Sequence, residues 1–343
     1  MVMLFGREWS QTELLSRVGQ MEQIAGIRLS EAGDGKARGC RILDVWNGTG
    51  LRFQVNAERA LDISSCDFKG QPLAWRSQVG DTHPAYYESQ GLGWLRSFPG
   101  GLLVTCGLDQ FGSPSQDGNT EFGLHGRISN CPASQVNYRT FWDGNDYKLA
   151  ITGKVRQASV FGENLTLQRH IETKLGSNLI HIEDIVTNEG FDPSPHMLLY
   201  HFNLGFPLLD ENANLNLKSE ETLPRDAAAQ NGIKEWDRFQ PPTHGYQEQV
   251  FIHRPVSDEK GISIVELKNT KTNLGLRWRY ENTNLPYLME WKMMGTGNYV
   301  VGIEPANCNG LGGHFATREA GQLPMLAPGE SRSYRIDLEV ISN

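Results

Sequence analysis

Short stretches in which apolar and polar residues alternate run through most of this chain, and they constrain its fold more than any other feature. The clearest is residues 165–172, where Leu, Leu, Arg and Ile alternate with Thr, Gln, His and Glu. After a turn at residues 176–178, the chain returns through a second alternating stretch at residues 180–184. A period of two is typical of a half-buried strand, so these segments predict an antiparallel hairpin. Similar stretches bounded by Gly, Asn, Asp and Pro, such as residues 51–55 and 334–341, predict an all-β antiparallel fold.

One segment near the start departs from this period. Ser10-Gln-Thr-Glu13 has the pattern of a helix capping box, and apolar residues recur at helical spacing from Leu14 to Ile24, before Gly26. The pattern predicts one amphipathic helix, which we place in an N-terminal helical extension of residues 1–35 packed on a single domain of residues 36–343. The polar stretch 210–243 shows little periodicity and is expected to be a long loop or an excursion from the sheets. No second helix is predicted.

Composition narrows the class of protein. The formal net charge is −8 and the Lys and Arg residues are scattered, so nucleic acid is not an expected partner. The five cysteines are widely spaced without a Cys-x-x-Cys pair, which indicates neither a disulfide framework nor a zinc site, and we expect no metal. The first residues lack the apolar core of a signal peptide and no apolar run has membrane-spanning length, so we expect a cytoplasmic protein without a membrane partner.

The first candidate site residue is Glu304, in the stretch Tyr-Val-Val-Gly-Ile-Glu-Pro-Ala-Asn of residues 299–307. On a strand, Val300, Gly302 and Glu304 share one face. Gly302 would leave room for a ligand near the backbone, and Pro305 is predicted to end the strand because it lacks an N–H. This arrangement suits an acid or base at the mouth of a sheet. The alternative is a surface carboxylate at a strand end.

Two histidines are candidates as well. In residues 197–205, Leu199, His201 and Asn203 share a strand face that is otherwise apolar. Burying such polar groups unpaired costs roughly 1–3 kcal/mol each, and a polar ligand would satisfy them. His125 lies in an irregular segment, where it either faces a ligand or bonds a local backbone carbonyl.

Other polar and aromatic residues are open to two interpretations. Glu248 is either a surface residue or a substrate contact. Trp291 either stacks on the apolar face of a sugar ring or packs in the core. His170, Glu172 and His181 fall on the polar face of the predicted hairpin and are assigned to cross-strand pairs.

Several motifs in this order resemble the galactose mutarotase-like superfamily of aldose 1-epimerases, and in particular its DUF4432 branch. They are Gly100-Gly-Leu-Leu-Val, Leu124-His125-Gly, His201-Phe-Asn-Leu, Gly302-Ile-Glu-Pro-Ala and, for the branch, Arg59-Ala-Leu-Asp62-Ile and Trp291-Lys-Met. The resemblance implies a large antiparallel β-supersandwich with an open cleft for a small sugar, and no cofactor. It also implies that Glu304 takes the proton of the anomeric hydroxyl, that His201 protonates the ring oxygen, and that His125 holds sugar hydroxyls.

The chain departs from the family pattern at two places. The acid histidine of relatives precedes the Asn by four residues, where this chain has Leu199; His201 precedes Asn203 by two. The usual substrate-binding arginine beside the Gly-Gly turn is displaced, because Pro99 occupies the nearest position. Arg96, Arg127 and Arg59 are the replacements considered, with Arg96 ranked first. Asp62, Asn203, Glu248 and Trp291 complete the expected substrate-binding set.

Two functions are consistent with these residues. The first is an aldose 1-epimerase-like isomerase, which interconverts anomers of a free monosaccharide or sugar derivative by Glu/His acid–base ring opening. The second is a noncatalytic carbohydrate-binding or sensing protein on the same fold. The sugar, the anomer, the carbon that reacts and the oligomeric state are left open.

Overall fold

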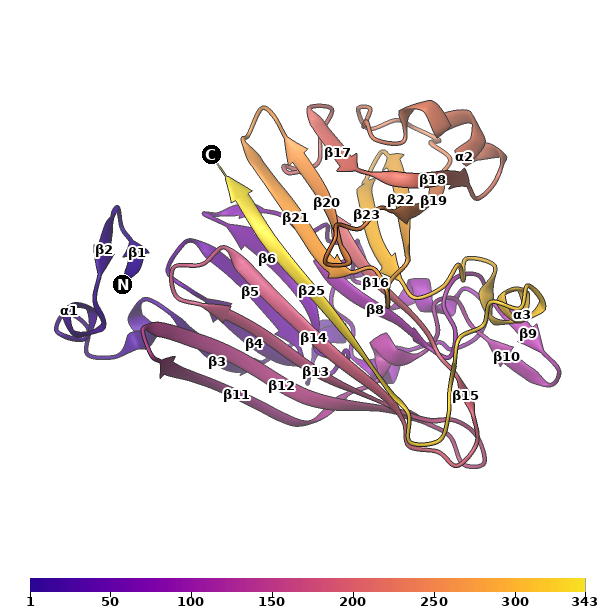
Figure 1. Cartoon of the computed structure of the whole chain (residues 1–343), viewed down its shortest axis with the longest axis horizontal. Coiled ribbons are helices and arrows are strands. Elements are labelled where there is room, and N and C mark those ends of the chain that lie inside the picture. Colours follow the sequence, from indigo (N-terminus) through magenta and orange to yellow (C-terminus); the bar gives the residue numbers. More distant parts are fainter. Residues whose placement is uncertain (343) are drawn as a thin grey trace.

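Two layers of antiparallel strands form most of the molecule (Figure 1). The computed structural model describes residues 1–342; position 343, the last of the expected β domain, lies outside the described residues. The fold is the predicted all-β antiparallel architecture of the galactose mutarotase-like class.

One layer is an eight-stranded sheet, whose long strands run side by side across Figure 1. In spatial order its strands are β11 (Ala133–Asp143), β12 (Asp146–Ala158), β13 (Asn164–Lys174), β14 (Leu179–Asn188), β25 (Ser331–Ser342), β21 (Leu274–Glu281), β20 (Ile262–Asn269) and β17 (Ala213–Leu217). β13 and β14 form the predicted hairpin, and Glu172 pairs with His181 across it. His170, Glu172 and His181 therefore lie in a cross-strand surface group, as predicted.

The other layer contains two sheets. The six-stranded sheet has the order β18 (Ser219–Pro224), β19 (Gln249–Pro255), β22 (Tyr287–Gly295), β23 (Asn298–Ala306), β16 (Met197–Leu204) and β8 (Leu103–Leu108). The five-stranded sheet has the order β3 (Gly26–Glu31), β4 (Arg41–Trp46), β5 (Leu51–Asn56), β6 (Asp62–Phe68) and β7 (Gln71–Pro72). Contacts between β6 and β8 join the two sheets.

Within the six-stranded sheet, β8, β16 and most of β23 are buried on both faces, and the site lies on one of these faces. Tyr200, Phe202 and Ile303 point from one face into the main core between the layers. Leu199, Met289 and Ala306 point from the other face into a smaller apolar cluster with Trp94 and Phe98. The alternation predicted for β16 and β23 is therefore confirmed, and His201 and Glu304 lie on the face of the smaller cluster.

Two predictions about strand and helix ends were wrong. β23 runs through Pro305 to Ala306. No ladder pair with β16 is formed at residues 304 and 305, so the N–H that Pro305 lacks is not needed for pairing there. The N-terminal helix α1 (Gln11–Leu15) has the predicted capping box but ends after five residues. Gly19 follows and Gln20 is extended, so only a 3-10 helix at Met21–Gln23 continues the pattern. β3, within the expected extension, pairs with β4 and so joins the sheet.

The segment 210–243 is not a long loop. Alternate residues Ala213, Leu215 and Leu217 are buried and form β17 at a sheet edge, where the polar Asn residues between them face outward. β18 and the short helix α2 (Ala227–Gly232) follow. A third helix, α3 (Gly313–Glu319), also contradicts the prediction of a single helix. The remaining short strands are β1 (Val2–Leu4), β2 (Arg7–Trp9), β9 (Ser115–Asp117), β10 (Thr120–Phe122), β15 (Ser194–Pro195) and β24 (Met325–Leu326).

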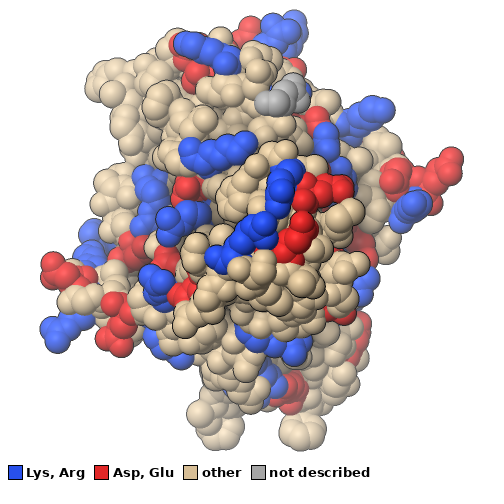
Figure 2. Space-filling view, turned by 90° about the vertical axis from the view of Figure 1, so that its left-hand side faces the viewer, with Lys and Arg blue, Asp and Glu red and all other residues tan. Residues whose placement is uncertain are grey.

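Charges of both signs are mixed on the surface. Figure 2 shows Lys and Arg interspersed with Asp and Glu over the face that it displays. No helix among residues 1–342 has the length and apolar character needed to cross a membrane.

Candidate functional site

The strand register brings His201 and Glu304 together. β16 and β23 pair with Phe202 opposite Ile303 and Leu199 opposite Ala306, and the same register places His201 opposite Glu304. Opposite residues on neighbouring strands share a face and lie close. His201 Nε2 is 3.1 Å from Glu304 Oε1, with both side chains at most 5% exposed. This contact does not count as a hydrogen bond, because Glu304 Oε1 is buried without a hydrogen-bond partner. His201 Nδ1 is also buried without a partner, so both side chains can still form hydrogen bonds with a ligand.

Gly302 is required for the position of the Glu304 carboxyl group. A Cβ atom added at residue 302 would lie 2.3 Å from Glu304 Oε1 and 3.0 Å from Trp291 Cβ. The space above the glycine is thus occupied by the Glu304 side chain itself. The prediction that this space receives a ligand was wrong, although the glycine does shape the site.

His125 is the third polar group of this cluster. Its backbone is left-handed (φ +57°), a conformation that is uncommon for residues other than glycine and frequent at functional sites. Backbone bonds hold it there, because its N–H donates to Gly112 O and its carbonyl accepts from Gly107 N–H. Its ring lies perpendicular to that of His201 with centroids 5.6 Å apart, and its buried Nδ1 has no partner. This geometry favours the ligand-facing interpretation of His125.

The three residues line a cavity of about 530 Å³. Its walls are mostly apolar and include the aromatic side chains of Trp75, Trp94, Phe98 and Trp291. The rings of Phe98 and Trp291 lie 5.4 and 5.5 Å from that of His201, both edge-on. Flat aromatic walls with a few polar groups at one end are typical of small-molecule sites.

A charged bridge borders the cavity. Arg225 follows β18 and its Nη2 donates to Glu248 Oε1 (2.9 Å), just before β19. The indole Nε1 of Trp291 donates to the other oxygen of Glu248 (2.9 Å). All three side chains line the cavity, so Glu248 and Trp291 are placed in the site.

Burial controls the protonation of the polar end. It raises the pKa of Glu304 well above the ordinary value, and the nearby Glu248 carboxylate adds to this rise. Burial lowers the pKa of His201 well below the ordinary value, as does His125. The pKa of His125 falls to about 4 because its ring is desolvated. The neutral forms of Glu304, His201 and His125 are therefore favoured, which places the titratable proton of the Glu304–His201 pair on the carboxyl group.

The model of the domain of unknown function DUF4432 matches residues 37–340. The chain belongs to the DUF4432 family.

Solved structures show where this DUF4432 protein lies among known folds. A protein from Klebsiella pneumoniae subsp. pneumoniae MGH 78578, named a candidate aldose 1-epimerase, is 26% identical, with a TM-score of 0.88 over 94% of this chain and 86% of that chain. A galactose mutarotase-like protein from Clostridium acetobutylicum is 12% identical, with a TM-score of 0.66 over 94% of this chain and all of that one. Galactose 1-epimerase from Lactobacillus acidophilus NCFM is 13% identical, with a TM-score of 0.60 over 93% and 99%. No curated protein sequence matches the chain.

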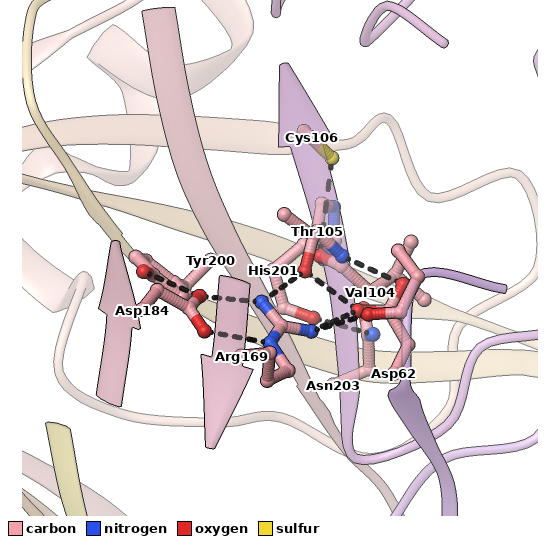
Figure 3. Close-up of polar contacts among 10 residues, drawn as sticks. Asp62, Val104, Thr105, Cys106, Arg169, Asp184, Tyr200, His201 and Asn203 are labelled. Carbon is pink, nitrogen blue, oxygen red and sulfur yellow. Dashed lines mark hydrogen bonds and ion pairs between the residues drawn. The ribbon is translucent and has the colours of Figure 1, made fainter. Parts of the chain in front are cut away.

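Several predicted site residues of the DUF4432 protein do not line the cavity. Arg96 lies in a neighbouring hollow, where its Nε is 3.4 Å from Glu88. Arg59 is buried and donates to Thr82 O. Asp62 lies in the interior, where it accepts from Arg169 Nη1 (2.8 Å) and from Thr105 (Figure 3). The structure therefore does not bring these three residues together with Glu304.

Asn203 has a supporting position. It shares the His201 face as predicted, but its amide nitrogen donates to the carbonyl oxygens of Gly101 and His201. Gly100 and Gly101 both have positive φ, and a Cβ at residue 101 would lie 2.8 Å from Ile63 O. Asn203 thus ties the Gly-Gly turn to the strand that carries His201. Arg127 is exposed and is not among the cavity residues.

The sequence reasoning missed Arg225 and most of the aromatic wall. Arg225 directly follows Pro224 at the end of a strand in the segment that was expected to be a loop. The alternation at Ala213, Leu215 and Leu217 was the available signal that this segment contains strands. Trp94 and Phe98 lie in a loop with a 3-10 helix (Gly93–Arg96), which has no periodicity that indicates which ring faces the site.

Proposed function

We propose that this protein is an aldose 1-epimerase-like isomerase that interconverts the anomers of a free monosaccharide. The observation that carries the proposal is the contact between His201 and Glu304 in the wall of a cavity that also has four Trp and Phe side chains in its walls. The names of the Klebsiella and Lactobacillus relatives support the same reaction class. We retain Glu304 as the base and His201 as the acid.

The proposed reaction is balanced within one pair of side chains. In the reactive form Glu304 is a carboxylate and His201 carries the proton. Glu304 accepts the proton of the anomeric hydroxyl while His201 donates its proton to the ring oxygen, and the bond between that oxygen and C1 breaks to leave an aldehyde. This step yields the neutral pair that burial favours. After C1 rotates, reversal of both transfers closes the ring on the other face.

Neighbouring strands suit this chemistry. The anomeric hydroxyl oxygen and the ring oxygen are both bonded to C1, so the acid and the base must lie close enough together to reach two oxygens on one carbon. His201 and Glu304 face each other from β16 and β23, and the rotation of either side chain is restricted by burial. Positioned acid–base groups of this kind typically accelerate reactions by about a hundred- to ten-thousand-fold.

A noncatalytic sugar-binding protein is the second candidate. The observation that favours it is the direct contact of Nε2 and Oε1, which leaves no space for a sugar atom between acid and base unless a side chain moves. In this case the three polar groups would only bind hydroxyls.

Glu304→Gln separates these functions. We expect the variant to exchange the anomeric NMR signals of aldoses at least about a hundredfold more slowly than wild type, because the amide cannot accept the proton. Sugar binding, measured by tryptophan fluorescence, should persist. Glu172→Gln is the matched control, since this half-buried carboxylate of the β13–β14 hairpin does not line the cavity, and it should retain wild-type exchange. Wild-type rates in Glu304→Gln would remove Glu304 as the base, whereas wild-type binding without exchange for any aldose would establish the noncatalytic function.

A further inference from the structure

The cavity contains a cation whose charge is already balanced. Among the described residues that line it, Arg225 is the only Lys or Arg. Its Nη2 is 2.7 Å from Asp226 Oδ2 and 2.9 Å from Glu248 Oε1, and its Nε also donates to Asp226. Two carboxylates on one guanidinium leave no net positive charge for a ligand.

Glu248 is the carboxylate of this group that lines the cavity. One of its oxygens accepts from Arg225 and the other from the indole of Trp291. Both oxygens are therefore used within the protein. Glu248 simultaneously fixes the orientation of an aromatic wall and covers the guanidinium with negative charge.

The other nearby cations lie outside this cavity. Lys36 and Arg96 line the neighbouring open hollow, which shares Val79, Leu92 and Leu95 with the cavity as a common apolar wall. Arg96 is also close to Glu88. An anionic group inside the cavity would thus find two carboxylates, those of Glu248 and Asp226, around the only guanidinium.

We propose that Glu248 is a specificity-determining residue, which masks Arg225 and makes the cavity reject sugars that carry a carboxylate. This inference rests on the proposed function to the extent that the cavity binds a sugar. The carboxylate of a sugar acid binds favourably to a cation whose N–H donors are free. In this cavity it would have to displace Glu248 from Arg225, or lie beside Glu248 and be repelled by its like charge. A hydroxymethyl group incurs neither cost. Selectivity thus comes from a repulsive element in addition to attractive contacts.

The test compares sugars that differ only at C6. Glucose is paired with glucuronate and galactose with galacturonate, and binding is measured by tryptophan fluorescence at constant ionic strength. We expect wild type to bind each neutral sugar at least about tenfold more tightly than its acid. Glu248→Gln keeps the side-chain shape and removes the carboxylate that lies between Arg225 and the cavity, although Asp226 still pairs with Arg225. The ratio should therefore shift by about tenfold or more toward the acid.

Two controls isolate the masking effect. Glu88→Gln removes one negative charge from the Arg96 pair in the neighbouring hollow, and it should leave the neutral-to-acid ratio unchanged. The double variant Glu248→Gln, Arg225→Gln should lose the gain for the acid, because the guanidinium that Glu248 had covered is gone. A merely structural role of Glu248 would weaken both sugars of a pair equally.

The outcomes of this test and of the proposed reaction are distinguishable. If wild type binds hexuronates as tightly as hexoses, or if Glu248→Gln leaves the ratio unchanged, the masking role is overturned even when anomers are exchanged. If the neutral sugars bind selectively but no anomer exchange occurs, masking stands and the isomerase proposal fails. If no sugar of either kind binds, both are overturned.

Discussion

At the scale of single residues, the site depends on one missing side chain. Gly302 precedes Glu304 by two positions on β23, and the Glu304 carboxyl group occupies the volume in which a residue-302 side chain would project. The same absence lets the Trp291 side chain on β22 approach across the sheet. The position of the proposed base is therefore set by a residue that makes no polar contact with it.

Gly302→Ala tests this dependence. The new Cβ would meet Glu304 Oε1 at 2.3 Å, so we expect the carboxyl group to be displaced from His201. Anomer exchange should fall by about ten- to a hundredfold, since misplaced reacting groups lose rate steeply. NMR exchange measures the rate, and circular dichroism checks the fold.

Gly33→Ala is the control for this substitution, because no atom lies within 4 Å of a Cβ at residue 33. It should retain wild-type exchange. An active Gly302→Ala with unchanged rates would show that the Glu304 position tolerates the added methyl group.

At the scale of elements, a buried ion network contacts the strands that carry the site on the face opposite the cavity. Arg169 on β13 makes two bonds to Asp184 on β14 (2.9 and 2.7 Å) and one to Asp62 on β6. Tyr200 on β16 and Thr105 on β8 bond into the same group (Figure 3). Tyr200 is adjacent to His201 but points to the opposite face, so the network links both layers behind the cavity.

Arg169→Met should destabilise the protein strongly. The substitution leaves Asp62 and Asp184 buried without their cation, and breaking a buried pair in this way costs about 3–5 kcal/mol. Urea unfolding measures the free energy of unfolding.

Arg277→Met provides the matched comparison for Arg169→Met. Arg277 pairs with Glu266 and Glu339 on the same sheet, but its side chain is 28% exposed. We expect a loss of about 1 kcal/mol or less. Equal losses in the two variants would contradict a special contribution of the buried network.

At the scale of the whole molecule, burial of neutral histidines makes stability depend on pH. His196 is fully buried, its Nε2 lies 2.6 Å from the Tyr334 hydroxyl oxygen, and desolvation lowers its pKa to about 3. Between this value and the ordinary pKa of 6.5, the unfolded state binds a proton that the folded state does not. His196 therefore makes the protein less stable as pH falls below about 6.5, and it has no such effect at higher pH.

His196→Gln should remove this contribution. We expect the slope of unfolding free energy against pH, measured by urea unfolding between about pH 4.5 and 5.5, to decrease by about 1.4 kcal/mol per pH unit. The control Tyr334→Phe loses the same contact but keeps the imidazole, so it should lower stability without changing the slope. An unchanged slope in His196→Gln would mean that His196 is protonated in the folded state.

Which residues share a strand face could be predicted from local sequence. Alternation in residues 197–204 and 299–304 assigned His201, Asn203, Gly302 and Glu304 correctly, because the two-residue period follows from local backbone geometry. The capping box at Ser10 was predictable for the same reason, since its bonds span only three residues.

Which strand faces contact each other, in contrast, depends on the packing of distant strands. Three features depend on pairing between distant strands: the register that sets His201 against Glu304, the presence of Arg225 rather than Arg96 in the cavity wall, and the burial of Arg59 and Asp62 in the interior. Such pairing results from the packing of the whole chain. A side chain has the same local pattern whether it faces the cavity or a buried partner, so local sequence carries no information about that choice.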